Sequence, residues 1–287
     1  MKTSPLRFAA MLTATALTAA CYPPIDPPAS TPEPASTLHY ADFADQVTGA
    51  PMIVDVTVRE ARRIDISAAT GLASQRDRFD VTATVNSLLR GSSAIPPEIR
   101  FLADVRQTAA GKSAKLRKNR FFIFARPVPG KPGQVQLSNP DSIILFTPEH
   151  DALVRGITQE SVRIDAPPAI TGLSQAFHVP GTITGEGETQ IFLTTEKERP
   201  ISISVLSRPG QTRSWSVSLG EVVDMNARAP ARNTLLWYRL ACQRMPRLLP
   251  EAALEGQDDA ARAQAQSDYA FVWSALGPCP RANQGGA

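Results

Sequence analysis

The chain of 287 residues contains few histidines, cysteines and aromatic residues, and neither sign of charge is in large excess. It has three histidines, three cysteines and 6% Phe, Trp and Tyr, against 43% hydrophobic and 20% charged residues. A net charge of +3 is too small for a polycation that holds nucleic acid by its phosphates, so no nucleic-acid partner is expected. The composition is typical of a folded, soluble chain rather than a disordered or membrane-spanning one.

Motifs that would indicate an enzyme are also missing. There is no Gly-x-Ser-x-Gly elbow, no His-Glu-x-x-His pair and no Cys-x-x-Cys pair. His178, Glu186 and Glu188 are weak candidates for metal ligands, but their spacing matches no known metal motif, and an ordinary loop is the favoured interpretation. We therefore expect no metal site and no cofactor, and the sequence leaves an enzymatic role uncertain but favours a non-enzyme.

The N-terminus has the pattern of an export signal. Lys2 and Arg7 precede a run without charges over residues 8–20, and small residues stand directly before Cys21. The apolar run is too short to cross a membrane, because a spanning helix needs about 20 apolar residues. We predict that residues 1–20 are a signal peptide, whose removal lowers the net charge from +3 to +1.

The residues Leu17-Thr18-Ala19-Ala20-Cys21 resemble the bacterial lipobox, although Thr18 stands where the commonest form has Leu. The resemblance implies that Cys21 is acylated, with palmitate among its chains, and that two or more chains hold the protein on a membrane. Residues 21–37 then form a lipidated cysteine and a proline-rich tether. Tyr22, rather than Asp, follows the cysteine, and by resemblance to the enterobacterial sorting rule this implies an outer-membrane lipoprotein that faces the periplasm. The alternative is an ordinary secretory signal that leaves Cys21 as a free thiol.

The two remaining cysteines are an even pair in a chain predicted to be exported. Cys242 and Cys279 are 37 residues apart, and in an oxidising compartment such a pair favours a disulfide. Closing a loop of this length contributes about 4 kcal/mol of stability in the chain-entropy account. Two unpaired thiols are the alternative.

The segment 38–165 predicts a first, β-rich domain. A short helix is expected over 40–48, followed by strands over 53–58, 79–85, 98–105, 120–125, 134–137 and 142–146. Short strands separated by turns rich in proline and glycine indicate a small antiparallel barrel or sandwich. A helix that Thr147 caps and Pro148 opens is expected to end the domain, with its boundary at 165–168.

Part of this segment resembles a known fold. A valine-rich strand, a long alternating strand that ends in Leu88-Leu89-Arg90-Gly91 and a strand that begins Glu98-Ile99-Arg100-Phe101 resemble the start of OB-like and netrin-like (TIMP-like) barrels. The resemblance covers residues 51–105, and it implies a fold rather than an activity. More loosely, the stretches 188–193 and 235–242 make the chain similar to uncharacterised predicted lipoproteins of alphaproteobacteria, which implies no activity.

The segment 166–287 predicts a second, α+β domain. Strands over 188–195, 201–207 and 214–219 alternate apolar residues with polar ones, so each offers one apolar face. Helices are expected from Asn233 to Met245 and from Asp258 to Gly277. The fold class is therefore β-rich α+β: an N-terminal antiparallel barrel or sandwich, then an antiparallel sheet covered by two C-terminal helices.

One charge asymmetry suggests a partner. No acidic residue stands between Asp104 and Asp141, whereas the basic residues there include Lys112, Lys115, Arg117, Lys118 and Arg120. We hypothesise that these five bind an anionic surface, such as lipopolysaccharide or anionic lipid, at about 1 kcal/mol for each basic residue. A solvated loop that leads into a core strand is the alternative.

Taken together, these features favour a lipid-anchored envelope lipoprotein that acts as a non-enzymatic interaction or envelope-maintenance module. Its expected partners are the membrane, through the N-terminal lipid, and an envelope protein or anionic lipid. Two alternatives remain: a lipid-anchored periplasmic hydrolase with a site between the domains, near residues 178–188, and a small-ligand carrier.

Overall fold

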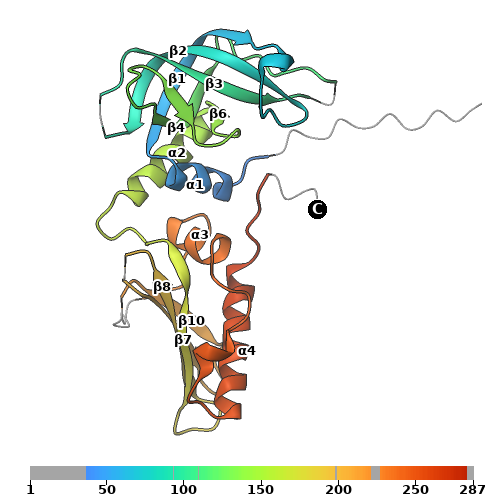
Figure 1. The fold of residues 1–287 in the computed structure, drawn as a ribbon. Helices are drawn as coiled ribbons and strands as arrows, with labels where there is room; N and C mark the ends of the chain where they lie inside the picture. The colour runs from blue at the N-terminus through green and yellow to red at the C-terminus, as the bar shows by residue number, and fades with distance from the viewer. Residues whose placement is uncertain (1–36, 93, 109, 198, 221–226, 283–287) are drawn as a thin grey trace, which may run out of the picture. The chain divides into compact units, whose positions relative to one another are not determined.

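A computed structural model describes residues 37–92, 94–108, 110–197, 199–220 and 227–282 (Figure 1). The described residues form one compact unit that contains two antiparallel sheets and four α-helices, so the predicted β-rich α+β class is confirmed. The predicted signal peptide, Cys21 and all of the tether except its last residue lie outside the described residues. The division at residue 165 stays a prediction.

The first sheet has six strands in the order β3-β2-β1-β4-β5, with β6 paired to β4. All six predicted strands are present. β1 and β2 are longer than predicted, because bulges between Val58 and Glu60 and at two earlier points shift their register and interrupt the two-residue alternation. The bounds are β1 Met52–Arg63, β2 Arg76–Arg90, β3 Glu98–Arg106, β4 Arg120–Pro127, β5 Val135–Leu137 and β6 Ile143–Leu145, with a 3₁₀ turn η1 at Ile66–Ala68.

Within the described residues this sheet does not close into a barrel. Its two end strands, β3 and β5, share a single bridge between Arg100 and Gln134, in which Arg100 N–H donates to the Gly133 carbonyl at 2.8 Å. β5 is only three residues long. It forms its ladder with β4, where Leu137 pairs with Ala125, and not with β3. Of the barrel or sandwich expected from the sequence, a closed barrel is therefore not found among the described residues, although β3 and β5 lie side by side.

Two helices, α1 (Tyr40–Gly49) and α2 (Pro148–Ser161), pack against each other beside the first sheet. Both follow the prediction. The Thr147 hydroxyl caps α2 by accepting a hydrogen bond from His150 N–H at 3.1 Å, and Pro148 occupies the first turn. Phe43 of α1 and Val154 of α2 are fully buried, and they share one hydrophobic cluster with Phe122 of β4.

The second sheet has four strands in the order β10-β9-β8-β7, one more than predicted. The sequence pattern does not predict β7, because bulges between Ile170 and Gly172 and between Leu173 and Gln175 break its alternation. The bounds are β7 Ile170–Pro180, β8 Gly187–Thr195, β9 Ile201–Ser207 and β10 Ser214–Ser218.

The helix α4 (Asp259–Leu276) packs along β7 and β8, after a 3₁₀ turn η2 at Glu251–Leu254 (Figure 1). As predicted, Asp258 caps α4 by accepting a hydrogen bond from Ala261 N–H at 2.8 Å. The shorter helix α3 (Leu235–Cys242) corrects the prediction of a helix from Asn233 to Met245. Thr234 caps it, because Asn233 has a φ of 58° and lies outside the helix.

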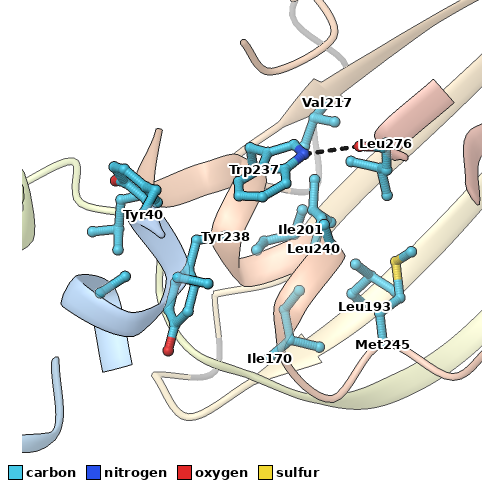
Figure 2. Packing of buried hydrophobic residues seen from close by; sticks show 14 of the residues in the cluster. Tyr40, Ile170, Leu193, Ile201, Val217, Trp237, Tyr238, Leu240, Met245 and Leu276 are labelled. Atoms are coloured by element: carbon cyan, nitrogen blue, oxygen red, sulfur yellow. Dashed lines mark hydrogen bonds between the residues drawn. The ribbon is translucent and has the colours of Figure 1, made fainter. Parts of the chain in front are cut away.

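The side chains of α3 fill the core beneath the second sheet. Figure 2 shows Trp237 beside Val217 and Ile201, and its indole N–H donates to the Leu276 carbonyl at 2.9 Å. The hydroxyl of Tyr238, the next residue of α3, donates a hydrogen bond to Asp45 of α1 at 2.5 Å. Burial, followed by the hydrogen bond and charge of Asp45, raises the pKa of Tyr238 above its ordinary value.

The expected disulfide between Cys242 and Cys279 is present. It joins the end of α3 to the segment that follows α4. Arg281, two residues further on, pairs with Asp45 of α1 at 2.8 Å and donates to the Cys242 carbonyl at 3.2 Å. The disulfide and the Arg281–Asp45 ion pair together therefore fix the last described residues against α3 and α1.

Candidate functional site

A groove of about 940 Å³ opens on the solvent face of the first sheet, between β3 and the β4–β5 hairpin. Alternation along β3 creates it: Phe101 and Ala103 point into the core, whereas Arg100, Leu102 and Asp104 point outward. We call this site the polar groove. It is lined by Ile64, Arg78, Asp80, Arg100, Phe101, Leu102, Asp104, Val128, Lys131, Gln134, Val135, Gln136, Leu137, Ser138, Asn139 and Pro140.

Two ion pairs between β2 and β3 form one wall of the polar groove. The Arg78 guanidinium binds both carboxylate oxygens of Asp104, at 2.7 and 2.8 Å. Arg100 binds Asp80 in the same two-pronged way, with its Nε 2.7 Å from Oδ1. The hydrogen bond from Arg100 lowers the pKa of the Asp80 carboxyl against a weaker opposing effect of burial. The wall is therefore polar but nearly neutral.

The other wall carries amides and one lysine. Gln134, Gln136 and Asn139 supply neutral donors and acceptors, and Lys131 is exposed at the hairpin. Gln136 Oε1 accepts a hydrogen bond from the Arg126 guanidinium at 2.9 Å, which orients the glutamine side chain. Leu102 is 52% exposed and is the apolar side chain on the outer surface of β3 within the groove.

A buried arginine contacts two of the residues that line the polar groove, Asp104 and Pro140. Arg76 of β2 donates to the carbonyl of Asp104 at 2.7 Å and to the carbonyl of Pro140 at 3.3 Å. Its other nitrogen binds the Asp141 carboxylate at 2.6 Å. Burial opposes ionisation of Asp141, but hydrogen bonds from Arg106 and Arg76 outweigh it and lower the pKa of this carboxyl. Arg76 thus links the end of β3 to the segment that follows β5.

A second polar cluster lies inside the other sheet. The Thr189 hydroxyl donates to Asp268 at 2.5 Å, so it accepts from Nδ1 of His178 at 2.9 Å. Arg213 and Gln264 hold the second carboxylate oxygen of Asp268, each at 3.2 Å. Thr189 is fully buried and Asp268 is 1% exposed, so this arrangement of His, Thr and Asp fastens α4 to β7 and β8 and offers no accessible nucleophile.

The candidate metal ligands are not brought together. His178 and Glu188 lie on adjacent strands, but His178 faces α4 whereas Glu188 is one register position away on the opposite face. Glu186 belongs to the turn that joins the strands. No cluster of three potential ligands occurs among the residues that the structure describes.

The five basic residues of the loop between β3 and β4 divide into two groups. Lys112, Lys115, Arg117 and Lys118 are exposed. Arg120 instead begins β4, pairs with the buried Asp55 at 2.8 Å and lies 3.6 Å from the centre of the Phe146 ring. Its charge is therefore compensated inside the fold, and anionic-surface binding by the other four stays a prediction.

A smaller pocket of about 370 Å³ lies where α1, α3 and the start of β7 meet. Asp45, Glu196, Tyr238 and Arg244 are among the residues that line it, and no residue of the segment 178–188 does. The polar groove and the buried cluster were not predicted, because both depend on which strands become neighbours. In both Arg78-Phe79-Asp80 and Arg100-Phe101-Leu102, a phenylalanine stands between residues that face the other side of a strand. This alternation was the one signal in the sequence for a charged outer face.

Comparison with known proteins adds no family: no protein-family model matches the chain, and no curated protein has a similar sequence. None of the described helices combines the length and the apolar character that crossing a bilayer requires.

Proposed function

We propose that this chain is a lipoprotein of the outer membrane, anchored through Cys21 and facing the periplasm, and that it acts as a non-enzymatic binding module. The observation that carries the binding role is the polar groove, a hollow of about 940 Å³ with an exposed leucine, neutral amides and compensated charges. Such a lining supplies directional hydrogen bonds and, apart from Lys131, compensated charges, which suits recognition of a polar ligand with little net charge.

The disulfide supports the proposed compartment. Stable disulfides form in exported proteins and are rare in the reducing cytosol. Cys242 and Cys279 are joined, while Cys21, the third cysteine, remains available for acylation in the predicted lipobox. This use of the three cysteines is the one expected for a chain that is secreted and then anchored.

The test places a photoreactive amino acid at Leu102 in the full-length chain, expressed in a bacterium with an outer membrane. Leu145 is the matched control, because it is 50% exposed on β6, compared with 52% for Leu102, and does not line the polar groove. Irradiation of living cells is expected to give a discrete adduct from Leu102 and none from Leu145. Equal adducts at both positions, or none at either, would contradict the binding role.

The same cells test the anchor. Labelled palmitate is expected to enter the wild-type chain and not the Cys21→Ala variant, because the thiol carries the lipid. The variant should also leave the outer-membrane fraction. Retained labelling in Cys21→Ala would refute the lipobox assignment, whatever the cross-linking shows.

A further inference from the structure

We propose that a second site, formed by the loop between β3 and β4 and by the end of β1, docks on the anionic phospholipid surface of the membrane that holds Cys21. The site does not overlap with the lining of the polar groove, and it rests on the proposed lipid anchor for the choice of this membrane. Five exposed cations form it, and we call them the basic patch: Arg59, Lys112, Lys115, Arg117 and Lys118.

The structure changes the membership of the site that the sequence predicts. Arg120 does not belong to the basic patch, because its guanidinium pairs with the buried Asp55. Arg59 joins the patch from the end of β1. The Arg117 guanidinium donates to the Arg59 carbonyl at 3.2 Å, so cations that are 58 residues apart in the sequence become neighbours.

Contacts with the rest of the first sheet hold the loop of the basic patch in place. Its Leu116 is 4% exposed and belongs to the hydrophobic cluster inside the sheet. Lys118 N–H donates to the Val58 carbonyl at 2.9 Å, and the Asn119 side chain donates to the Lys115 carbonyl at 2.6 Å. Because the backbone is already fixed, little of its conformational freedom is lost when the cations meet a partner.

The charges of the basic patch are not compensated. None of its five cations forms an ion pair with the carboxylates that the structure describes. Asp77, which the loop contacts through the Ser113 hydroxyl, is already paired with Arg63. The exposed Glu60 follows Arg59 in the chain and opposes only one of the five charges. The patch therefore keeps a strong positive charge.

The form of the basic patch favours an extended anionic surface over a small ligand. None of its residues lines the polar groove or the smaller pocket. Three of the five cations are lysines, whose compact charge attracts phosphates without demanding one geometry. Because Leu116 is buried, the loop offers no large apolar side chain to a bilayer. We therefore expect the contact to be electrostatic and to weaken as the salt concentration rises.

The proposed anchor brings a phospholipid surface within reach of the basic patch. Thr37, the first described residue, follows Cys21 by 16 residues, a length of chain that can extend to at most about 55 Å. The chain then enters α1, which packs beside the first sheet through Phe43 and Phe122. The sheet that carries the patch is therefore the one that the tether joins.

The test measures flotation with lipid vesicles of the full mature chain that carries Cys21→Ala, so that no acyl chain contributes. One set of vesicles contains about one third phosphatidylglycerol in phosphatidylcholine, and the other contains phosphatidylcholine alone. The protein is expected to float with the first set at low salt and not with the second. About 1 M salt should release it, because charges are then screened beyond about 3 Å.

Two triple variants separate the basic patch from net charge. The patch variant reverses three cations of the loop: Lys115→Glu, Arg117→Glu and Lys118→Glu. The control variant reverses three exposed cations elsewhere: Lys197→Glu, Arg208→Glu and Arg228→Glu. Both change the net charge equally. At about fivefold for each cation lost, the patch variant is expected to bind at least about a hundredfold more weakly, and the control variant to bind nearly like the wild type.

A single substitution tests the cation that only the structure reveals. Arg59→Gln is expected to weaken binding to the phosphatidylglycerol vesicles about fivefold. Arg126→Gln is the matched control, because Arg126 is exposed near the opposite end of β4 from the loop, and it should bind like the wild type. The circular dichroism spectrum of each variant shows whether it has folded.

Three results would overturn the proposal: the chain does not bind phosphatidylglycerol vesicles, the patch and control variants weaken equally, or the chain binds purified lipopolysaccharide and not these vesicles. The proposed function fails separately. An adduct at Leu102 without vesicle binding would refute the basic patch alone, and vesicle binding without palmitate on Cys21 would refute the anchor alone.

Discussion

The two sheets protect their end strands in different ways. The β7 edge of the second sheet is covered by Gln257, whose side-chain amide satisfies the backbone of both Ala176 and His178. The β3 edge of the first sheet meets the short strand β5 at the Arg100–Gln134 bridge, and Arg76 links the carbonyl of Asp104 to that of Pro140 beyond it. Unprotected edges invite pairing with other chains, and natural proteins usually block them. The second sheet thus protects its edge with a side chain, and the first with a short strand.

The charged side chains show the same contrast. In the second sheet, Asp268 is buried beneath α4 and uses its partners to hold the helix in place. In the first sheet, Asp80 and Arg100 pair on the outer surface, where they shape the polar groove and are reached by water. The cluster around Asp268 thus holds the second sheet together, whereas the Asp80–Arg100 pair of the first sheet lies at the solvent surface.

The largest expected effect concerns the buried cluster. Asp268→Ala leaves Thr189, Gln264 and Arg213 without their shared acceptor and is expected to lower the free energy of unfolding by about 3–5 kcal/mol. The matched substitution in the polar groove, Asp80→Ala, should cost about 1 kcal/mol or less, because its Arg100 partner is more than half exposed. Denaturant titration of both variants measures the difference. Equal losses would remove the contrast between the two sheets.

A smaller effect is expected from pH. The pKa of Asp80 is lowered by its hydrogen bond from Arg100, so the stability that this pair contributes is present above the unfolded pKa of about 3.9 and is lost as the pH falls through the lower folded value. The stability difference between the wild type and Asp80→Asn should therefore be about 1 kcal/mol or less at neutral pH and shrink below pH 4. A difference that grows on acidification would show that the pair is not ionised as described.

Much of the fold was predictable, because alternation and capping are local signals. Thr147 and Asp258 cap the helices that the sequence assigns to them, and the nine predicted strands are present. Where two signals competed, the prediction failed: Asn233 is a good capping residue, but its positive φ leaves the capping position to Thr234. β7 was missed because its bulges hide the alternation.

The site was less predictable, because it depends on contacts between distant segments. Arg78 and Asp104 are 26 residues apart, and Arg76 reaches Pro140 across 64. Gln257 lies 79 residues from the backbone that it covers. No local pattern reveals such pairs, whereas the Cys242–Cys279 disulfide could be predicted across 37 residues because only two cysteines remained to pair.

Amide hydrogen exchange in the ligand-free mature protein tests the central claim most directly, since it reports which backbone groups are already paired. The His178 amide, which donates to Gln257, is expected to exchange about as slowly as that of Phe101, which pairs with Val81. Gln257→Ala should raise the exchange rate of the His178 amide about tenfold or more, whereas Gln266→Ala, an exposed position on α4, should not. An unchanged His178 rate in Gln257→Ala would show that this side chain does not protect the β7 edge, and would contradict the account.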